Sequence, residues 1–120
     1  MGNRKPKALE IGEILAADTF YSYDAKYNIA ESKTVVGASL PEGKRSELLK
    51  LAEKSYAALG CEGYARVDFF MNEDGEFLLN EVNTIPGFTS ISMFPMLAMA
   101  SGMTYSEVLD EIIRLGIERS

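Results

Sequence analysis

The sequence predicts an α+β fold in which a mainly antiparallel sheet is flanked by helices. Two strand-like segments joined by an Asp-Gly turn occupy residues 64–83, and segments with helical periodicity lie on both sides of them. Strands grouped together and helices placed apart are typical of this class. The 120 residues match one domain or one piece of a larger domain.

The N-terminal third predicts two strands around a long loop. Residues 8–15 mix apolar and acidic positions like a strand, but no earlier segment is there to pair with them, so this edge of the sheet looks cut. Residues 16–32 are rich in tyrosine and turn-forming residues without a clear period, which is typical of an ordered loop with a functional role. Residues 34–37 fit a short strand.

A helix and a hairpin follow. Apolar residues at helical spacing predict a helix between residues 41 and 60, where Gly60 supplies a C-terminal stop. Residues 64–71 and 77–83 predict two strands, and the Asp-Gly pair between them is a strong hairpin signal.

The C-terminal part predicts two more helices. Residues 91–101 are apolar and rich in methionine, and these methionines are expected to fill the core. Thr104 and Glu107 form a capping box that opens a last helix, which is expected to end at about residue 118. The helical segment of the proposed domain piece is therefore residues 91–118.

Composition excludes several classes of function. A net charge of -6 argues against a nucleic-acid partner, because binding to a phosphate backbone needs clustered Lys and Arg. The chain has no His and one Cys, so any metal must be held by oxygen, and Cys61 fits a small buried apolar residue better than a nucleophile. No apolar run approaches the ~20 residues of a membrane span and no export signal is visible, so we expect a cytoplasmic protein without membrane contact.

Charged side chains gather on one face of the predicted hairpin. A two-residue turn would set Asp68 opposite Glu81 and Arg66 opposite Asn83. Two carboxylates placed ~4.5 to 5.5 Å apart at Cβ are destabilising unless a cation lies between them, and Mg²⁺ is commonly held by such oxygens. A four-residue turn would instead set Arg66 opposite Glu81 as an ordinary salt bridge. Spacing alone leaves the metal site and the salt-bridged surface as open alternatives.

The segment after the hairpin predicts an anion site. Residues 84–92 leave the second strand through Gly87, which lets the backbone approach a ligand closely, and then reach the start of a helix. Helix starts bind anions. The alternative for Ser90 and Ser92 is a simple role as helix N-caps.

The motifs resemble those of a known enzyme family. Tyr64-Ala-Arg66-Val-Asp68-Phe-Phe, followed by Leu79-Asn-Glu81-Val-Asn83-Thr-Ile-Pro-Gly87-Phe-Thr-Ser-Ile-Ser92, closely resembles the C-terminal signature of D-alanine–D-alanine ligases, which are ATP-grasp enzymes. The loop Thr19-Phe-Tyr-Ser-Tyr-Asp-Ala-Lys26-Tyr27 is similar to the flexible active-site loop of that family. The resemblance runs over nearly the whole chain and implies the C-terminal part of an ATP-grasp domain over residues 1–120.

The resemblance implies a metal and nucleotide site. Asp68, Glu81 and Asn83 would hold two Mg²⁺ ions, with Glu81 bridging them and Mn²⁺ as an alternative ion. Arg66 and Lys26 would contact the phosphates of ATP and the transferred phosphoryl group.

The resemblance also implies substrate contacts. Phe20 would lie near the nucleotide. The backbone N–H of Gly87 would stabilise the tetrahedral oxyanion together with Arg66, and Ser92 would hold the carboxylate of the second D-alanine. Tyr27 would close the loop over the substrates.

The implied reaction joins two D-alanines for peptidoglycan synthesis: ATP activates one carboxylate as an acyl phosphate, and the amine of a second D-alanine displaces phosphate. Ligases of this family are more than twice as long, so the chain is expected to be an incomplete portion that is inactive alone. Two alternatives stay open: another ATP-grasp carboxylate–amine ligase, and a non-catalytic fragment that binds Mg-nucleotide or forms a homodimer through an exposed interdomain surface.

Overall fold

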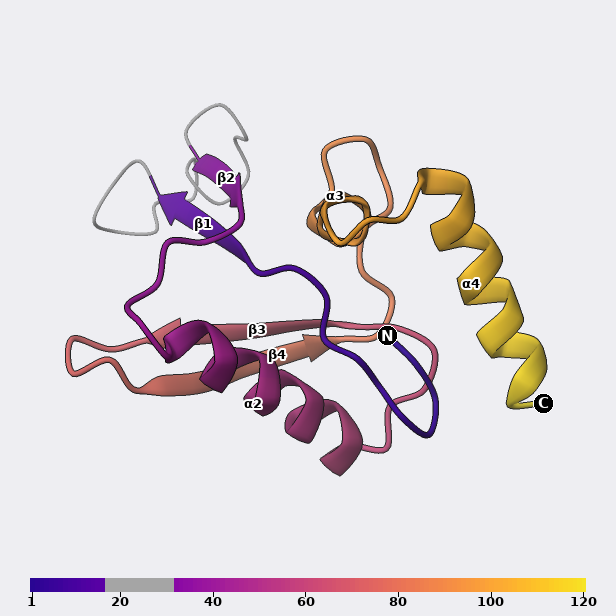
Figure 1. The fold of residues 1–120 in the computed structure, drawn as a ribbon, viewed down its shortest axis with the longest axis horizontal. Coiled ribbons are helices and arrows are strands. Elements are labelled where there is room, and N and C mark those ends of the chain that lie inside the picture. The colour runs from indigo at the N-terminus through magenta and orange to yellow at the C-terminus, as the bar shows by residue number, and fades with distance from the viewer. Residues whose placement is uncertain (17–31) are drawn as a thin grey trace.

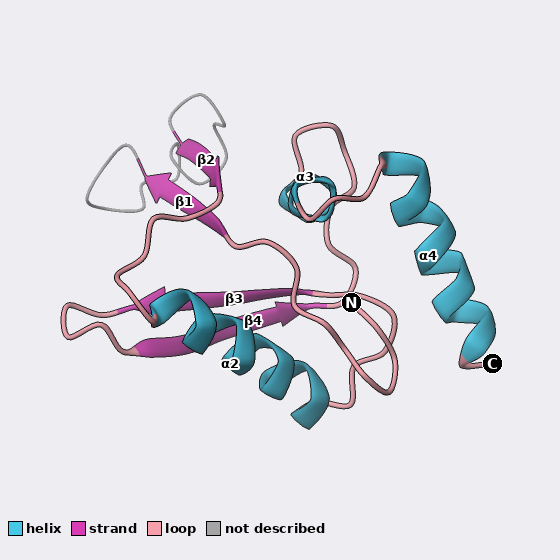
Figure 2. Ribbon diagram, in the orientation of Figure 1, coloured by secondary structure: helices cyan, strands magenta, loops and turns pink. Residues whose placement is uncertain are grey.

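The computed structural model describes residues 1–16 and 32–120. Within these residues, seven regular elements follow one another (Figures 1 and 2). They are β1 (Gly12–Ala16), β2 (Ser32–Val36), α2 (Lys44–Ala58), β3 (Arg66–Met71), β4 (Phe77–Asn83), α3 (Met93–Ala100) and α4 (Tyr105–Glu118). No helix in these ranges is long and apolar enough to cross a membrane.

The strands form two separate antiparallel pairs, β1 with β2 and β3 with β4. The predicted α+β class with antiparallel pairing is therefore confirmed. The first strand begins at Gly12, four residues later than expected, because the preceding residues form no ladder with any described strand. Gly12 lies against α3 so closely that a Cβ atom there would collide with the Met93 side chain.

Helix α2 lies along the β3–β4 hairpin (Figure 1). Its start is not capped by a side chain, because the N-cap is Gly43 in the left-handed region with φ of 82°. Glycine is among the residues accepted at an N-cap and costs only about a few tenths of a kcal/mol against a capping side chain, so the helix can begin there. Tyr56 is the one buried residue of the helix, and its hydroxyl donates a hydrogen bond to the Gly2 carbonyl over 2.8 Å. Burial raises the pKa of Tyr56 to about 12.

The N-terminal residues clamp three segments together. The Gly2 N–H donates to the Gly63 carbonyl over 2.8 Å, and the Gly63 N–H donates to Asn3 Oδ1 over 2.9 Å. Asn3 Nδ2 donates in turn to the Leu115 carbonyl in α4 over 3.0 Å. The turn before β3 is thereby tied to the last helix, although the two are distant in sequence.

The core lies between α3 and α4 at the base of the hairpin. Its buried members are Phe94, Ala98 and Val108, and partly buried apolar residues pack around them: Leu9, Tyr64, Phe88, Met103 and Ile112. The capping box is present as predicted, since Thr104 Oγ1 accepts from the Glu107 N–H and the Thr104 N–H donates to Glu107 Oε1. Met99 departs from the expectation of core filling, because 42% of it is exposed.

Candidate functional site

The hairpin places Asp68 directly opposite Glu81, and Arg66 directly opposite Asn83. The expected alignment is present, although neither expected turn length is. The Asn72 N–H donates to the Glu76 carbonyl over 2.9 Å, which leaves three residues in the loop. The resulting one-residue offset is cancelled farther along, where the register shifts between Asp68 and Phe69 and β4 carries one unpaired residue.

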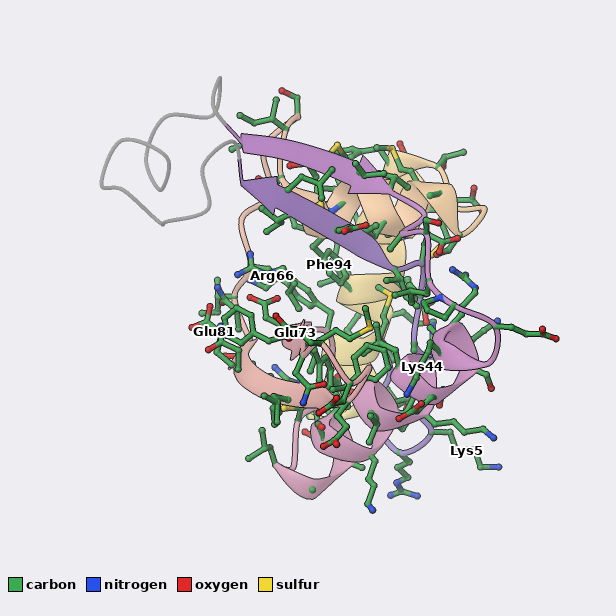
Figure 3. All side chains as sticks on the ribbon, turned by 90° about the vertical axis from the view of Figure 1, so that its left-hand side faces the viewer. Lys5, Lys44, Arg66, Glu73, Glu81 and Phe94 are labelled. Atoms are coloured by element: carbon green, nitrogen blue, oxygen red, sulfur yellow. The ribbon has the colours of Figure 1, made fainter. Side chains whose placement is uncertain are left out.

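Arg66 bridges the two opposed carboxylates. Its Nε donates to Asp68 Oδ1 over 2.9 Å and its Nη2 donates to Asp68 Oδ2 over 3.1 Å, which is a two-pronged contact. The same Nη2 lies 3.7 Å from Glu81 Oε1. Arg66 and Glu81 project on the same side of the hairpin (Figure 3). The carboxylates are opposed as the two-residue turn predicts, and Arg66 forms a salt bridge with Glu81 without lying directly opposite it, so the metal site stays a prediction.

The electrostatics of this cluster follow from partial burial. The side chains of Arg66 and Asp68 are 30% and 28% exposed, whereas that of Glu81 is 59% exposed. The hydrogen bonds to Asp68 raise the pKa of Arg66 above its usual value, with a smaller contribution from the Glu81 charge. The guanidinium thus supplies the positive charge that two facing carboxylates require.

The fit of a metal ion can be judged from the donor set. In residues 1–16 and 32–120 no three Asp, Glu, His or Cys side chains gather closely enough to hold an ion together. The predicted set holds only two carboxylates, and its third member is the amide of Asn83, whose Oδ1 accepts from the Ile85 N–H over 3.1 Å. Mg²⁺ commonly takes one or two protein carboxylates and fills its other positions with water and phosphate oxygens, so Asp68 and Glu81 fit that ion.

The loop after β4 brings Gly87 next to Ser92. A Cβ atom on Gly87 would lie 2.9 Å from Ser92 Oγ, so only glycine leaves this hydroxyl where it is. Ser92 is the N-cap of α3, yet its side chain makes no capping hydrogen bond. Its Oγ instead accepts from the Thr89 N–H over 2.9 Å and lies 2.7 Å from Thr89 Oγ1. Ser92 therefore occupies the N-cap position considered for it, but its hydroxyl bonds to Thr89 and does not cap the helix backbone.

Three predicted site residues, Phe20, Lys26 and Tyr27, lie outside the described residues. Their roles stay predictions. In the antiparallel pair of β1 and β2, Gly12 is opposite Val36 and Ala16 is opposite Ser32. The predicted loop therefore lies in the sequence between two paired strands.

The comparison with protein families decides the relationship. The family described as "D-ala D-ala ligase C-terminus" matches residues 1–114. The chain belongs to this family. The D-alanine–D-alanine ligase of Chlorobaculum tepidum is 49% identical over 120 residues, which make up 99% of this chain and 33% of that protein. The chain therefore spans about a third of the length of the curated relatives that it matches.

Solved structures of D-alanine–D-alanine ligases have the same fold. The ligase from Coxiella burnetii superposes with a TM-score of 0.82 at 37% identity, over 98% of this chain and 30% of that one. The Bacillus anthracis ligase complexed with ATP gives a TM-score of 0.74 at 40% identity, over 92% of this chain and 36% of that one. The expected resemblance to the C-terminal portion of this family is confirmed.

Sequence reasoning missed two features of this chain. Asn80 is the unpaired residue of β4, and nothing in its neighbourhood in the sequence marks a bulge. Thr89 holds Ser92, and the signal that could have found it is the Thr-x-x-Ser spacing before a helix, which is a common local hydrogen-bonding pattern.

Proposed function

We propose that this chain supplies the metal-binding and phosphate-binding part of an ATP-dependent D-alanine–D-alanine ligase, with peptidoglycan precursor synthesis as its purpose. The observation that carries the proposal is the opposition of Asp68 and Glu81 with the Arg66 fork between them. Membership of the ligase family supports it, as does the likeness to a relative complexed with ATP. We further propose that residues 1–120 are one piece of an ATP-grasp domain, and a cytoplasmic location stays a prediction.

The hairpin residues would work on the phosphate groups. Asp68, Glu81 and Asn83 would hold the Mg²⁺ ions, which when bound neutralise phosphate charge during transfer. Arg66 offers five N–H donors in a planar fork, which match the oxygens of a phosphoryl group. An acyl phosphate formed from the first D-alanine would therefore develop its charge beside a preorganised cation.

The loop after β4 would hold the second substrate. The Ser92 hydroxyl accepts a hydrogen bond from the Thr89 N–H, and when Thr89 Oγ1, 2.7 Å away, is the donor between the two hydroxyls, the Ser92 hydrogen would point to a carboxylate oxygen of the substrate. The Gly87 N–H would donate to the oxyanion of the tetrahedral intermediate, and the absence of a Cβ lets it lie close to Ser92. Lys26, Phe20 and Tyr27 keep the proposed roles of phosphate contact, nucleotide contact and loop closure.

We propose that the chain alone makes no dipeptide, because the relatives that it matches are about three times as long. Detectable D-alanyl-D-alanine formation by the purified chain would overturn this. The second candidate function is a non-catalytic fragment that self-associates. It is favoured by large exposed apolar side chains on the hairpin and on α4, among them Phe70, Leu78, Ile113 and Ile117.

Calorimetric titration with ADP tests the first proposal. The purified chain is titrated with and without Mg²⁺, together with Glu81→Ala and with Glu73→Ala as the matched control, because Glu73 is an exposed carboxylate at the hairpin turn (Figure 3). We expect Mg²⁺-dependent binding in the parent chain and in the Glu73 variant, and its loss in the Glu81 variant. Binding that ignores Mg²⁺ or survives Glu81→Ala would contradict the proposed metal site.

A further inference from the structure

The Arg66 fork engages both oxygens of Asp68. Nε donates to Oδ1 over 2.9 Å and Nη2 donates to Oδ2 over 3.1 Å, so the planar guanidinium and the carboxylate form two parallel hydrogen bonds. Such charge-assisted pairs are shorter and stronger than neutral ones and fix the orientation of both groups. In this arrangement both oxygens of Asp68 already accept a hydrogen bond from a cation that belongs to the chain.

The same guanidinium also faces the second carboxylate. Nη2 lies 3.7 Å from Glu81 Oε1, and Asp68 and Glu81 are register partners across the hairpin. Both ion pairs that the described residues give to these two carboxylates come from Arg66. The guanidinium therefore stands where a cation shared by Asp68 and Glu81 would also have to stand.

A guanidinium and a divalent ion would repel each other between these two carboxylates. Two positive charges a few Å apart repel each other, and a partly buried site screens this repulsion less than bulk water does. Mg²⁺ also demands carboxylate oxygens at ~2.0 to 2.1 Å in octahedral geometry, so it would draw on the Asp68 oxygens that the fork already engages. The two cations therefore compete for Asp68.

We propose that Arg66 is the resident counter-ion of the metal site and that the divalent ion displaces it from Asp68. The inference rests on the proposed function, because it concerns how that site is loaded. Displacement breaks two hydrogen bonds to Asp68 and frees the Arg66 donors for an anion. Metal loading and phosphate recognition are thereby coupled: without the ion, the fork that should face phosphate is held by Asp68.

The test follows the Arg66 Nε–H directly in the unaltered 120-residue chain. A ¹⁵N-labelled sample is titrated with MgCl₂, and the arginine Nε–H signals are assigned by triple-resonance NMR. We expect the Arg66 signal to shift and to lose its protection from exchange as the ion binds. Arg114 is the internal control, because it forms a similar fork with Glu111 in α4, far along the chain from the hairpin. Its signal should not change.

A charge-preserving variant separates displacement from simple repulsion. Arg66→Lys keeps one positive charge but cannot make the two parallel hydrogen bonds. We expect its affinity for Mn²⁺, measured by the loss of the free-ion EPR signal, to rise about five- to ten-fold, the order expected for charge-assisted bonds in a partly exposed site. Arg114→Lys should leave Mn²⁺ binding unchanged.

Each outcome decides the inference. An Arg66 Nε–H signal that stays unchanged while Mg²⁺ binds, or equal Mn²⁺ affinity of the parent and Arg66→Lys, would overturn it. Failure of every variant to bind Mn²⁺ would also overturn it, since removing the fork should uncover the two carboxylates. The proposed function fails separately: Mg²⁺-dependent ADP binding can persist while Arg66 stays on Asp68, and Arg66 can be displaced in a chain that binds no ADP.

Discussion

The α3–α4 core and the β3–β4 hairpin are built in opposite ways, although Tyr64 packs on the first and leads into the second. Phe94 and Val108 are almost completely buried in the core. In the hairpin no strand residue is fully buried, and the register partners Phe70 and Leu78 are 58% and 53% exposed. One region is held by burial, the other by register and hydrogen bonds.

The two regions therefore have different roles, the core in folding stability and the hairpin in ligand binding. Apolar burial is the main favourable term in folding, so the helical core should carry most of the stability of the chain. The candidate site lies on the hairpin and its loop, where side chains stay accessible to ligands. Substitutions at Asp68 or Glu81 should therefore change ligand binding more than they change folding.

Truncating a phenylalanine to alanine should lower the free energy of unfolding much more in the core than in the hairpin. Phe94→Ala should lower the free energy of unfolding by about 3 to 5 kcal/mol, because it leaves a cavity among Tyr64, Phe88 and Val108. Phe70→Ala should change it by less than about 0.5 kcal/mol, as expected for an exposed position. Urea unfolding followed by circular dichroism measures both. Equal costs would mean that the hairpin face is covered in solution.

Replacing glycine by alanine should lower the free energy of unfolding in the hairpin and raise it in α4. Gly75 in the hairpin turn has φ of 81°, so Gly75→Ala should destabilise by about 1 to 2 kcal/mol. Gly116 lies inside α4 with open space where its Cβ would go, so Gly116→Ala should stabilise by about 0.5 to 1 kcal/mol. Thermal unfolding of the two variants gives the signs. A destabilised Gly116 variant would show that α4 has a close neighbour on that face.

The hydrogen bonds of the N-terminal residues Gly2 and Asn3 should contribute a smaller amount of stability. Tyr56→Phe removes the hydroxyl that donates to the Gly2 carbonyl and should cost about 1 kcal/mol, the usual net value of one hydrogen bond. Hydrogen exchange should also speed up at the Gly63 N–H, because Gly2 and Asn3 hold that turn. Loss of stability without faster exchange there would assign the cost to α2 alone.

Acid should weaken the capping box at the start of α4. The hydrogen bond from the Thr104 N–H lowers the pKa of Glu107 below its ordinary value of 4.5. A lowered folded-state pKa adds stability above the unfolded pKa, and this stability is lost as the pH falls through the folded value. Glu107→Gln can still cap but does not titrate, so its helix content between about pH 5 and pH 3 should fall less than that of the parent chain. Identical circular dichroism curves would contradict this role.

At the site, the sequence predicts the facing residues correctly but not the loop that aligns them. The opposition of Asp68 and Glu81 was expected from a two-residue turn, and it is present although the loop holds three residues. Asn80 restores the alignment as a bulge, which no local pattern announces. The capping box at Thr104 was expected and is present, because its two hydrogen bonds join residues three apart.

Local chemistry let the sequence by itself determine the α+β class, the order of the elements, the hairpin and the start of α4. These features depend on side-chain period, turn residues and caps, which act within a few residues. Only the tertiary structure decided that Asn3 ties the turn before β3 to α4, that the Ser92 hydroxyl bonds to Thr89, and that Arg66 holds Asp68. Each of these side chains has several possible hydrogen-bond partners along the chain, and packing selects the partner that comes within reach. A shift of one residue in the strand register also changes which side chains face each other.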